Sequence, residues 1–336
     1  MSQVAVDQSN QRVSVKLSTG QPEPGAREAV ACILCGAALK KGLGGLFDTR
    51  FGLDGSYDVS LCQSCGLEQT SPIPTLPELK ALYESHYNFG GEKDTLYTNL
   101  RAWFYSSFLY RLWIRLDGDL SFHGRKGTGC LLDIGCNEGR GLEIYARNGF
   151  DVEGLELNPA AAAKASETGF KVHTCELADL NANCRYDVAV LSNVLEHSLD
   201  PRSMLVSANR ILKPGGKVWI SCPNSRSFLR KLFGIYWINW HVPFHIVHFH
   251  AGSLATLLRE TGFSSILIRP ITPAIWLTDS IIAKLFARRA RPTREIRNPL
   301  LVVMLLIFVR FALFPALWLL NQCGRGDCLL VTATKT

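Results

Sequence analysis

Two pairs of cysteines near the N-terminus have the spacing of a metal site. Cys32 and Cys35 form one Cys-x-x-Cys pair, Cys62 and Cys65 form the other, and a glycine follows each pair. Four thiolates can complete a tetrahedral shell around Zn²⁺, and the glycines permit the positive φ that each turn requires. Without a metal, a segment this short would have little core of its own. The spacing therefore predicts a structural zinc ribbon over residues 29–70.

A second chemically suited group follows the apolar run that begins at Leu131. Asp133, Gly135 and Gly139 form the pattern Asp-x-Gly-x-x-x-Gly, a turn that opens a helix. The helix N-terminus offers free amides to a carboxylate, the glycines allow close backbone approach, and Asp133 can receive an ammonium group. A dinucleotide site would instead need Gly-x-Gly-x-x-Gly to hold a pyrophosphate. The loop therefore favours a ligand with a methionine-like tail.

A further acid completes this predicted site. Glu156 ends the next apolar run, about 20 residues beyond the loop, where an acid in doubly wound folds hydrogen-bonds ribose hydroxyls. We therefore expect Glu156 to bind a ribose.

The elements that must position these residues alternate from Gly129 to the end of the chain. Short apolar runs typical of strands are separated by segments with helical periodicity. This alternation indicates a mostly parallel sheet with helices on both faces and a ligand at the carboxyl ends of its strands. We predict an α/β, Rossmann-like doubly wound domain over residues 129–336.

The run from Leu131 to Pro270 resembles a class I S-adenosylmethionine (SAM)-dependent methyltransferase of the broad subgroup that includes ubiquinone-type O-methyltransferases. Besides the loop and the acid, Tyr186–His197 resembles the fourth strand of that family and its following loop. Leu212–Gly216 is similar to the turn before its fifth strand. The resemblance implies a seven-stranded sheet, SAM as the cofactor, and methyl transfer to an oxygen or carbon.

The resemblance also implies which residues bind SAM. The loop residues that would bind the methionine end are Asp133, Gly135, Cys136, Asn137 and Gly139. Glu156 and Leu157 would bind the ribose, Glu176 and Leu177 the edge of the adenine, and Asn193 would line the pocket wall. Many family members have glycine where this chain has Asn137, but asparagine tolerates left-handed φ and the turn can survive.

Histidines supply the candidate catalytic groups. Methyl transfer from a sulfonium is an in-line displacement, so the protein mainly aligns the acceptor, excludes water and provides a base. His197 follows the fourth strand, and His245 and His248 lie in the histidine-dense run Trp240–His250. Related methyltransferases often carry Pro-x-His-x-x-His-Phe there, which implies a substrate loop rather than a metal site. We predict catalytic roles for these three histidines, and a purely structural hydrogen bond is the alternative for His197.

The acceptor class follows from the end of the fourth strand. Methylases of amino groups in nucleic acids and proteins usually have Asn or Asp followed by Pro-Pro-Tyr there, whereas this chain has Ser192–Leu195. A small-molecule, sugar or lipid-linked acceptor is therefore favoured. An RNA methyltransferase that uses the ribbon for recognition is the alternative, although residues 32–65 contain only Lys40, Lys41 and Arg50 as basic residues. A non-catalytic SAM-binding protein is the third hypothesis.

The flanking segments carry weaker signals. Residues 1–28, rich in Gln, Ser, Gly and Pro, predict a flexible tail. Residues 71–128 have a proline-rich start and then helical patterns, which predict linker helices. Phe104, Phe108 and Leu112 recur at helical spacing, so we expect them to pack against the main domain rather than to stack on bases.

Residues 275–322 form an apolar helical insertion before the last predicted strand. Leu300–Leu320 is long enough to cross about 30 Å of hydrocarbon, but Arg310 at its middle would cost about 3 kcal/mol there and Pro315 would kink it. An interfacial hairpin at a membrane, with arginines against anionic headgroups, is easier to accept than a span. A cap over the substrate pocket or a dimer interface explains the apolarity equally well.

Charge and cysteine usage point to the compartment. Much of the net charge of +7 lies in one run beside the insertion: Arg288, Arg289, Arg291, Arg294 and Arg297. The eleven cysteines are either in the two pairs or scattered, and the N-terminus lacks a charged start followed by an apolar core. These features favour reduced thiols over disulfides. We expect a cytoplasmic protein, with the inner face of the membrane as its location if the insertion binds lipid.

Overall fold

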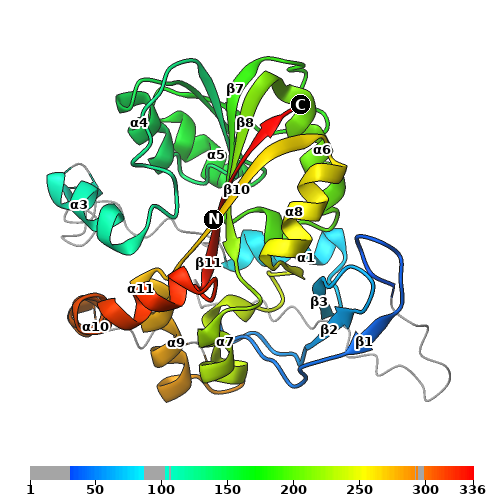
Figure 1. The fold of residues 1–336 in the computed structure, drawn as a ribbon, viewed down its shortest axis with the longest axis vertical. Helices are drawn as coiled ribbons and strands as arrows, with labels where there is room; N and C mark the ends of the chain where they lie inside the picture. The colour runs from blue at the N-terminus through cyan, green and yellow to red at the C-terminus, as the bar shows by residue number, and fades with distance from the viewer. Residues whose placement is uncertain (1–30, 87–102, 106, 292, 294–298) are drawn as a thin grey trace, which may run out of the picture.

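The structure is a computed structural model that describes residues 31–86, 103–105, 107–291, 293 and 299–336. The predicted tail over residues 1–28 lies outside these residues, as do Arg294 and Arg297 of the basic run. A large sheet with helices on both faces forms the main body of the molecule. A small N-terminal sheet and several apolar helices lie beyond one edge of it (Figure 1).

The large sheet has seven strands in the order β10-β11-β8-β7-β4-β5-β6. Their bounds are β4 (Cys130–Ile134), β5 (Asp151–Leu155), β6 (Lys171–His173), β7 (Tyr186–Ser192), β8 (Leu212–Pro223), β10 (Phe263–Ile271) and β11 (Cys328–Lys335). Strands β6, β5, β4, β7 and β8 pair in parallel, whereas β11 is antiparallel to both β8 and β10. The predicted mostly parallel, Rossmann-like sheet is confirmed.

Helices cover both faces of this sheet. Helices α4 and α5 lie on one side and helices α6 and α8 on the other (Figure 1). Their bounds are α4 (Arg140–Arg147), α5 (Pro159–Ser166), α6 (Pro201–Ile211) and α8 (Ala251–Glu260). Local chemistry explains two of the starts, because the side chains of Asn158 and Asp200 accept hydrogen bonds from the first-turn amides of α5 and α6, and a proline occupies the first turn of each.

The N-terminal unit contains a four-stranded antiparallel sheet in the order β1-β2-β3-β9. Its strands are β1 (Leu39–Lys41), β2 (Asp58–Cys62), β3 (Glu68–Ser71) and β9 (Val247–His248). Strand β9 comes from the histidine-dense run that the sequence assigned to a substrate loop. The pairing is supported by Thr70, whose amide donates to the carbonyl of Ile246 at 2.9 Å. The two parts of the chain are therefore built into one sheet.

Two helices precede the large sheet, α1 (Leu76–His86) and α3 (Phe108–Asp117). Helix α3 buries Tyr110 and Ile114. The side chains of Phe108 and Leu112 are instead 75% and 49% exposed, so the expectation that they pack against the main domain is wrong. The residues do form a helix, but its face with Tyr110 and Ile114 is the one that packs against Ile144 of α4. Phe104 is partly buried against the same cluster, as expected.

The insertion between β10 and β11 forms three helices, α9 (Ala274–Phe286), α10 (Pro299–Ala312) and α11 (Phe314–Gln322). None of the described helices is individually long and apolar enough to cross a membrane. The pair Val302–Ala312 and Phe314–Gln322 passes that test only when taken together, and it bends by 64° at the break. Pro315 lies in the first turn of α11, so the predicted kink is present.

Arg310 does not face the outside of the insertion. Its side chain is 3% exposed, and its Nη1 lies 3.1 Å from Oδ1 of Asp117 at the end of α3. The amide of Ala274 donates to the same carboxylate oxygen at 2.8 Å. This ion pair connects α3 to α10 and to the start of α9. The charge that interrupts the apolar stretch in the sequence is therefore paired inside the protein.

Replacement of Arg310 should reveal the cost of leaving Asp117 buried without its partner. We expect Arg310→Met to lower the free energy of unfolding by about 3–5 kcal/mol, because one charge of a buried pair would lose its counterion. Urea denaturation of the purified protein measures the loss. Arg310→Met combined with Asp117→Asn should recover most of it, and Arg259→Met on the surface of α8 should stay within about 0.5 kcal/mol of the wild type. Equal losses in the single and double variants would contradict this account.

Candidate functional site

The loop between β4 and α4 has the backbone conformation that close approach to a ligand requires. Gly135, Asn137 and Gly139 have φ values of 73°, 52° and 79°. A Cβ added to Gly135 would lie 2.7 Å from the Val194 side chain, so only glycine fits there. Asn137 sustains its left-handed turn with a local hydrogen bond, because its Oδ1 accepts from the amide of Glu138 at 2.7 Å. The expectation that asparagine preserves the turn is confirmed.

Glu156 connects this loop to the end of β5. Its Oε2 accepts from the amide of Asn137 at 2.9 Å, and its Oε1 accepts from the amide of Asn158 at 2.8 Å. The backbone carbonyl of Leu155 accepts from the amide of Gly135 at 2.7 Å, which fixes the loop against the same strand end. The structure thus brings the predicted loop and the predicted acid together at the carboxyl edge of the sheet.

Asp133 is a buried carboxyl group with no ion-pair partner among the described residues. Burial, and secondarily the charge of Glu156, raises the pKa of Asp133 to about 7. Burial of this kind disfavours the ionised form, and a nearby cation would restore it. The site is therefore chemically suited to an ammonium group.

The other predicted cofactor residues surround this loop with differing exposure. Cys136 is buried, whereas Leu157 is half-exposed directly after Glu156. After β6, Glu176 is exposed and Leu177 is buried. Asn193 follows β7 with a φ of 54°, and its buried Oδ1 has no hydrogen-bond partner among the residues that the structure describes. An amide oxygen without a protein partner and an exposed apolar side chain at this edge fit a nucleoside.

The first two predicted catalytic histidines lie together. The rings of His197 and His245 are 4.6 Å apart between centroids. The Nδ1 of His197 is 3.0 Å from the carbonyl of Phe244, and since a carbonyl only accepts, Nδ1 carries the hydrogen and Nε2 has the lone pair. Burial lowers the pKa of His197 to about 4, so its imidazole is neutral at pH 7. This arrangement leaves Nε2 as a basic atom.

Tyr83 on α1 is a site residue that the sequence did not reveal. Its hydroxyl lies 2.8 Å from Nδ1 of His197, and its ring packs edge-on against Phe244. Phe51, from the insert between the two cysteine pairs, contacts His241 and Phe244. Both residues come from the part of the chain that precedes the large sheet. The sequence around Tyr83 and Phe51 does not indicate these contacts, because the tertiary fold alone brings both residues beside the histidines.

A buried carboxyl group borders the histidine pair. One ligand atom from each of Glu196, His197 and His245 lies within 4.8 Å of the others, a geometry that could hold a divalent metal. Burial raises the pKa of Glu196 to about 8, which favours its neutral form in the absence of a cation. The metal alternative that the sequence left open therefore has a definite place in the fold.

His248 has different surroundings from the other two histidines. It lies in β9, its Nε2 is 3.0 Å from the hydroxyl of Thr70, and its ring packs against Trp240. Burial lowers the pKa of His248 to about 3. These contacts give His248 a structural part in the small sheet, and its catalytic role stays a prediction that the geometry does not favour.

The four predicted zinc ligands form one cluster. Their Sγ atoms lie within 4.8 Å of one another, with Cys32 to Cys65 at 3.6 Å and Cys35 to Cys62 at 3.5 Å. The amide of Cys65 points at the sulfur of Cys62 at 3.5 Å, as a metal-binding turn requires. Although burial opposes it, this bond and its neighbours lower the pKa of Cys62 to about 7. The donor set and the turn fit a tetrahedral metal.

Comparison with known proteins covers the middle of the chain. Residues 105–267 match a family model described as a methyltransferase domain, a range that also includes α3. A ubiquinone biosynthesis O-methyltransferase from Maricaulis maris is 30% identical over 163 residues, 44% of this chain and 63% of that protein. The enzyme of the same name from Erwinia tasmaniensis is 36% identical over 124 residues, 34% of this chain and 51% of that protein. The chain thus spans between half and two thirds of the length of these curated relatives.

Among solved structures, a SAM-dependent methyltransferase from Archaeoglobus fulgidus is similar, with a TM-score of 0.43 and 20% identity. The likeness covers 68% of this chain and all of the other chain.

Proposed function

We propose that the chain, whose residues 105–267 match a methyltransferase-domain model, is a class I SAM-dependent methyltransferase that transfers a methyl group from SAM to an oxygen or carbon of a small-molecule, sugar or lipid-linked acceptor. One observation carries the proposal. The Asp133 loop and Glu156 are joined by hydrogen bonds at the carboxyl edge of the sheet, and His197, which packs against His245, follows the neighbouring strand β7. We therefore assign the cofactor site and the base to neighbouring strands of the sheet, β4 and β7.

The cofactor residues take roles according to their chemistry. Asp133 receives the ammonium of the methionine end, and Gly135 and Gly139 let the backbone of the loop approach the ligand closely. Glu156 accepts from the ribose hydroxyls. Leu157 and Leu177 flank the adenine, with Glu176 at its edge, and Asn193 contributes its unpartnered amide oxygen to the wall.

The histidine pair supplies the acid–base chemistry. SAM, when bound, provides an electrophilic methyl group on a cationic sulfur, so the acceptor must lose a proton as it attacks. We assign that proton to Nε2 of His197, because Nδ1 is oriented by the carbonyl of Phe244 and by the hydroxyl of Tyr83. His245 lies against the same ring, and its own Nδ1 is fixed by the carbonyl of Asn239 at 2.8 Å. His245 therefore orients the base.

Calorimetric titration with SAM and S-adenosylhomocysteine tests the cofactor site. We expect Asp133→Ala and Glu156→Ala each to weaken binding at least tenfold, about 1.4 kcal/mol, because each removes a charged partner of the ligand. Glu260→Ala on the surface of α8 removes an acid elsewhere and should bind normally. His197→Gln should also bind SAM normally, yet lower kcat by about 10²–10⁴-fold in transfer to a hydroxylated acceptor. Unchanged affinity in both acid variants would refute the assignment.

The RNA alternative has little electrostatic support. Of the three basic residues between the cysteine pairs, Lys41 lies 2.6 Å from Asp58 and Arg50 lies 3.4 Å from Asp279. Both charges are therefore partly neutralised within the protein. A ribbon with this footprint is a poor binder of phosphate backbones, so we assign it a structural role.

That structural role rests on zinc, which we propose for the cysteine cluster. Zinc analysis of protein purified without chelators should find about one equivalent per chain. Cys35→Ser combined with Cys65→Ser removes two thiolates and should lower the content below half an equivalent. Cys184→Ser, which removes an exposed cysteine outside the cluster, should leave it unchanged. A wild-type content below half an equivalent would contradict the ribbon.

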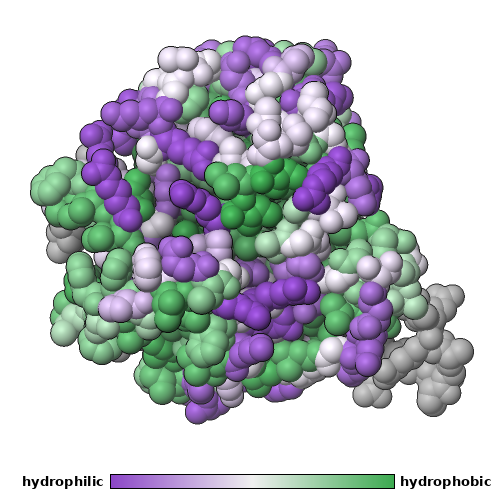
Figure 2. Space-filling view, viewed as in Figure 1, coloured by the Kyte–Doolittle hydropathy of each residue, from purple (hydrophilic) through white to green (hydrophobic). Residues whose placement is uncertain are grey.

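We further propose that the insertion docks on an anionic membrane surface. Along α10, Met304, Phe308 and Phe311 are each more than 60% exposed, and Trp318 and Leu319 on α11 are more than 50% exposed. Apolar atoms gather over α10, α11 and α3 at the left margin of Figure 2. These helices are neighbours, because Leu116 of α3 and residues of α10 and α11 line one small cavity.

Charge supports the same surface. Residues 299–326 contain no aspartate or glutamate, and exposed arginines end the preceding segment at Arg288, Arg289 and Arg291. A surface that combines a broad apolar face with nearby cations fits the boundary between headgroups and acyl chains. A large exposed patch of this kind is unusual in proteins that remain free in solution.

Flotation with vesicles of phosphatidylcholine and phosphatidylglycerol tests the docking surface. The wild-type protein should rise with the vesicles, because its exposed aromatic side chains insert into the interface. Phe308→Glu combined with Phe311→Glu should reduce the floating fraction at least tenfold. Val206→Glu, which places a charge on an exposed apolar position of α6, is the control and should float as the wild type does. Equal flotation of both variants, or none by the wild type, would exclude membrane docking.

A further inference from the structure

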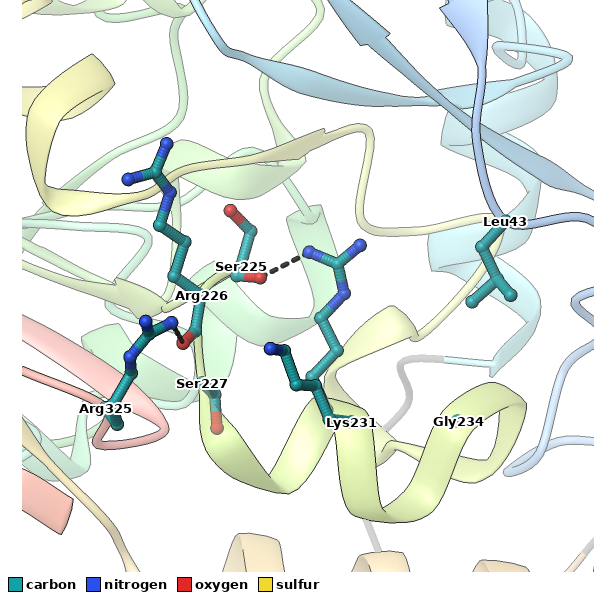
Figure 3. A pocket seen from close by; sticks show the side chains of 8 residues that line it. Leu43, Ser225, Arg226, Ser227, Lys231, Gly234 and Arg325 are labelled. Carbon is teal, nitrogen blue, oxygen red and sulfur yellow. Dashed lines mark hydrogen bonds between the residues drawn. The ribbon is translucent and has the colours of Figure 1, made fainter.

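A basic cavity of about 540 Å³ lies outside the sites described so far. It opens between α7 (Phe228–Phe233) and the turn before β11, directly after the carboxyl end of β8 (Figure 3). Its lining is dominated by cationic and hydroxyl side chains: Arg226, Arg230, Lys231 and Arg325, with Ser225 and Ser227. A pocket with this composition is suited to an anion rather than to an apolar ligand.

Three of the four cations are available to a ligand. Arg230 lies 2.8 Å from Oε2 of Glu68, and its guanidinium stacks over Trp240. Arg226, Lys231 and Arg325 are exposed, and none of them pairs with a carboxylate among the described residues. The cavity therefore holds a local excess of positive charge that the protein does not compensate.

A buried hydroxyl in the lining also lacks a partner. Ser225 is 2% exposed, and its Oγ has no hydrogen-bond partner among the residues that the structure describes. A buried polar group without a partner costs free energy, and a ligand oxygen in the cavity would supply the missing partner. Ser227 differs, because its hydroxyl donates to Asp327 and is already satisfied.

The cavity wall is fixed from behind. Asp327 accepts hydrogen bonds from Ser227, from the indole of Trp237 at 2.8 Å and from the amide of Asn239 at 3.0 Å. The guanidinium of Arg325 donates to the carbonyl of Arg226 at 3.3 Å, which joins the two sides of the opening (Figure 3). Both oxygens of Asp327 face these donors. The backbone that carries Arg226, Ser227 and Arg325 is thus held in place before any ligand arrives, which lowers the entropic cost of binding.

We infer that this cavity binds a diphosphate group. Guanidinium groups pair with phosphate oxygens through two parallel hydrogen bonds, and an ammonium adds a point charge. One phosphoryl group carries about −1.5 to −2 charges at pH 7, so three free cations suit two linked groups. This inference rests on the proposed function in one respect: the cavity follows the strand beside the histidine pair, so the diphosphate belongs to the acceptor. The acceptor class is then a diphosphate-linked molecule.

Titration of the full-length protein with inorganic pyrophosphate tests the cavity directly. We expect saturable binding that weakens at least tenfold in Arg226→Ala combined with Lys231→Ala, since two of the three free cations are lost. Arg259→Ala combined with Lys80→Ala removes two charges from the exposed surfaces of α8 and α1 and should change the affinity less than twofold. Absence of saturable binding at millimolar pyrophosphate, or equal weakening in both double variants, would overturn the inference.

Two organic ligands distinguish the source of the diphosphate. Uridine diphosphate and farnesyl diphosphate share the diphosphate group, but one carries a nucleoside and the other a prenyl chain. We expect the tighter-binding of the two to lose at least tenfold in affinity in the variant with Arg226→Ala and Lys231→Ala. Binding of both that is insensitive to Arg226 and Lys231 would overturn the inference. SAM titration of the same variant keeps the two proposals separate, because it should remain normal. A protein that binds pyrophosphate but not SAM would refute the proposed function alone.

Discussion

The pairing of β3 with β9 is the constraint on which the surroundings of the histidine pair and of the basic cavity depend. Only two residue pairs form it, Glu68 with His248 and Gln69 with Val247, and the amide of Thr70 extends it to Ile246. Through this contact the N-terminal unit is attached to the loop that follows β8. Tyr83 consequently reaches His197, and Glu68 reaches Arg230 at the edge of the basic cavity. A ribbon that is rigid around a metal would hold both contacts in register.

Two different electrostatic environments lie on either side of this contact. Around the histidine pair, burial lowers the pKa of His197 to about 4 and raises that of Glu196 to about 8, so both groups are neutral at pH 7. A neutral imidazole has a lone pair that can accept the proton lost by the acceptor during methyl transfer. The basic cavity is instead open and lined by Arg226, Lys231 and Arg325. On the two proposals, the acceptor's charge would be bound in the cavity, away from the uncharged histidine pair.

Local sequence predicted what depends on local geometry. The Asp133 loop, Glu156 and the cysteine pairs act through short spacings, and the alternation of apolar runs specified the large sheet. Contacts between residues far apart in the chain could not be predicted from the sequence. Nothing near Tyr83 signals its contact with His197, and the residues of β9 were expected in a substrate loop, whereas they pair with β3. Phe108 and Leu112 have the right period for a buried face, but period alone does not say which face of a helix is covered.

The contact of Arg310 with Asp117 is another long-range contact that the sequence does not indicate, and it explains how the apolar insertion accommodates a charge. In sequence, a charge in the middle of an apolar stretch argues against insertion into lipid. In the fold, Asp117 neutralises that charge inside the protein, and the outer face of α10 is left to Met304, Phe308 and Phe311. The ion pair also holds α10 against α3, whose exposed Phe108 and Leu112 extend the apolar surface. A buried charge thus makes a continuous apolar face compatible with a stable fold.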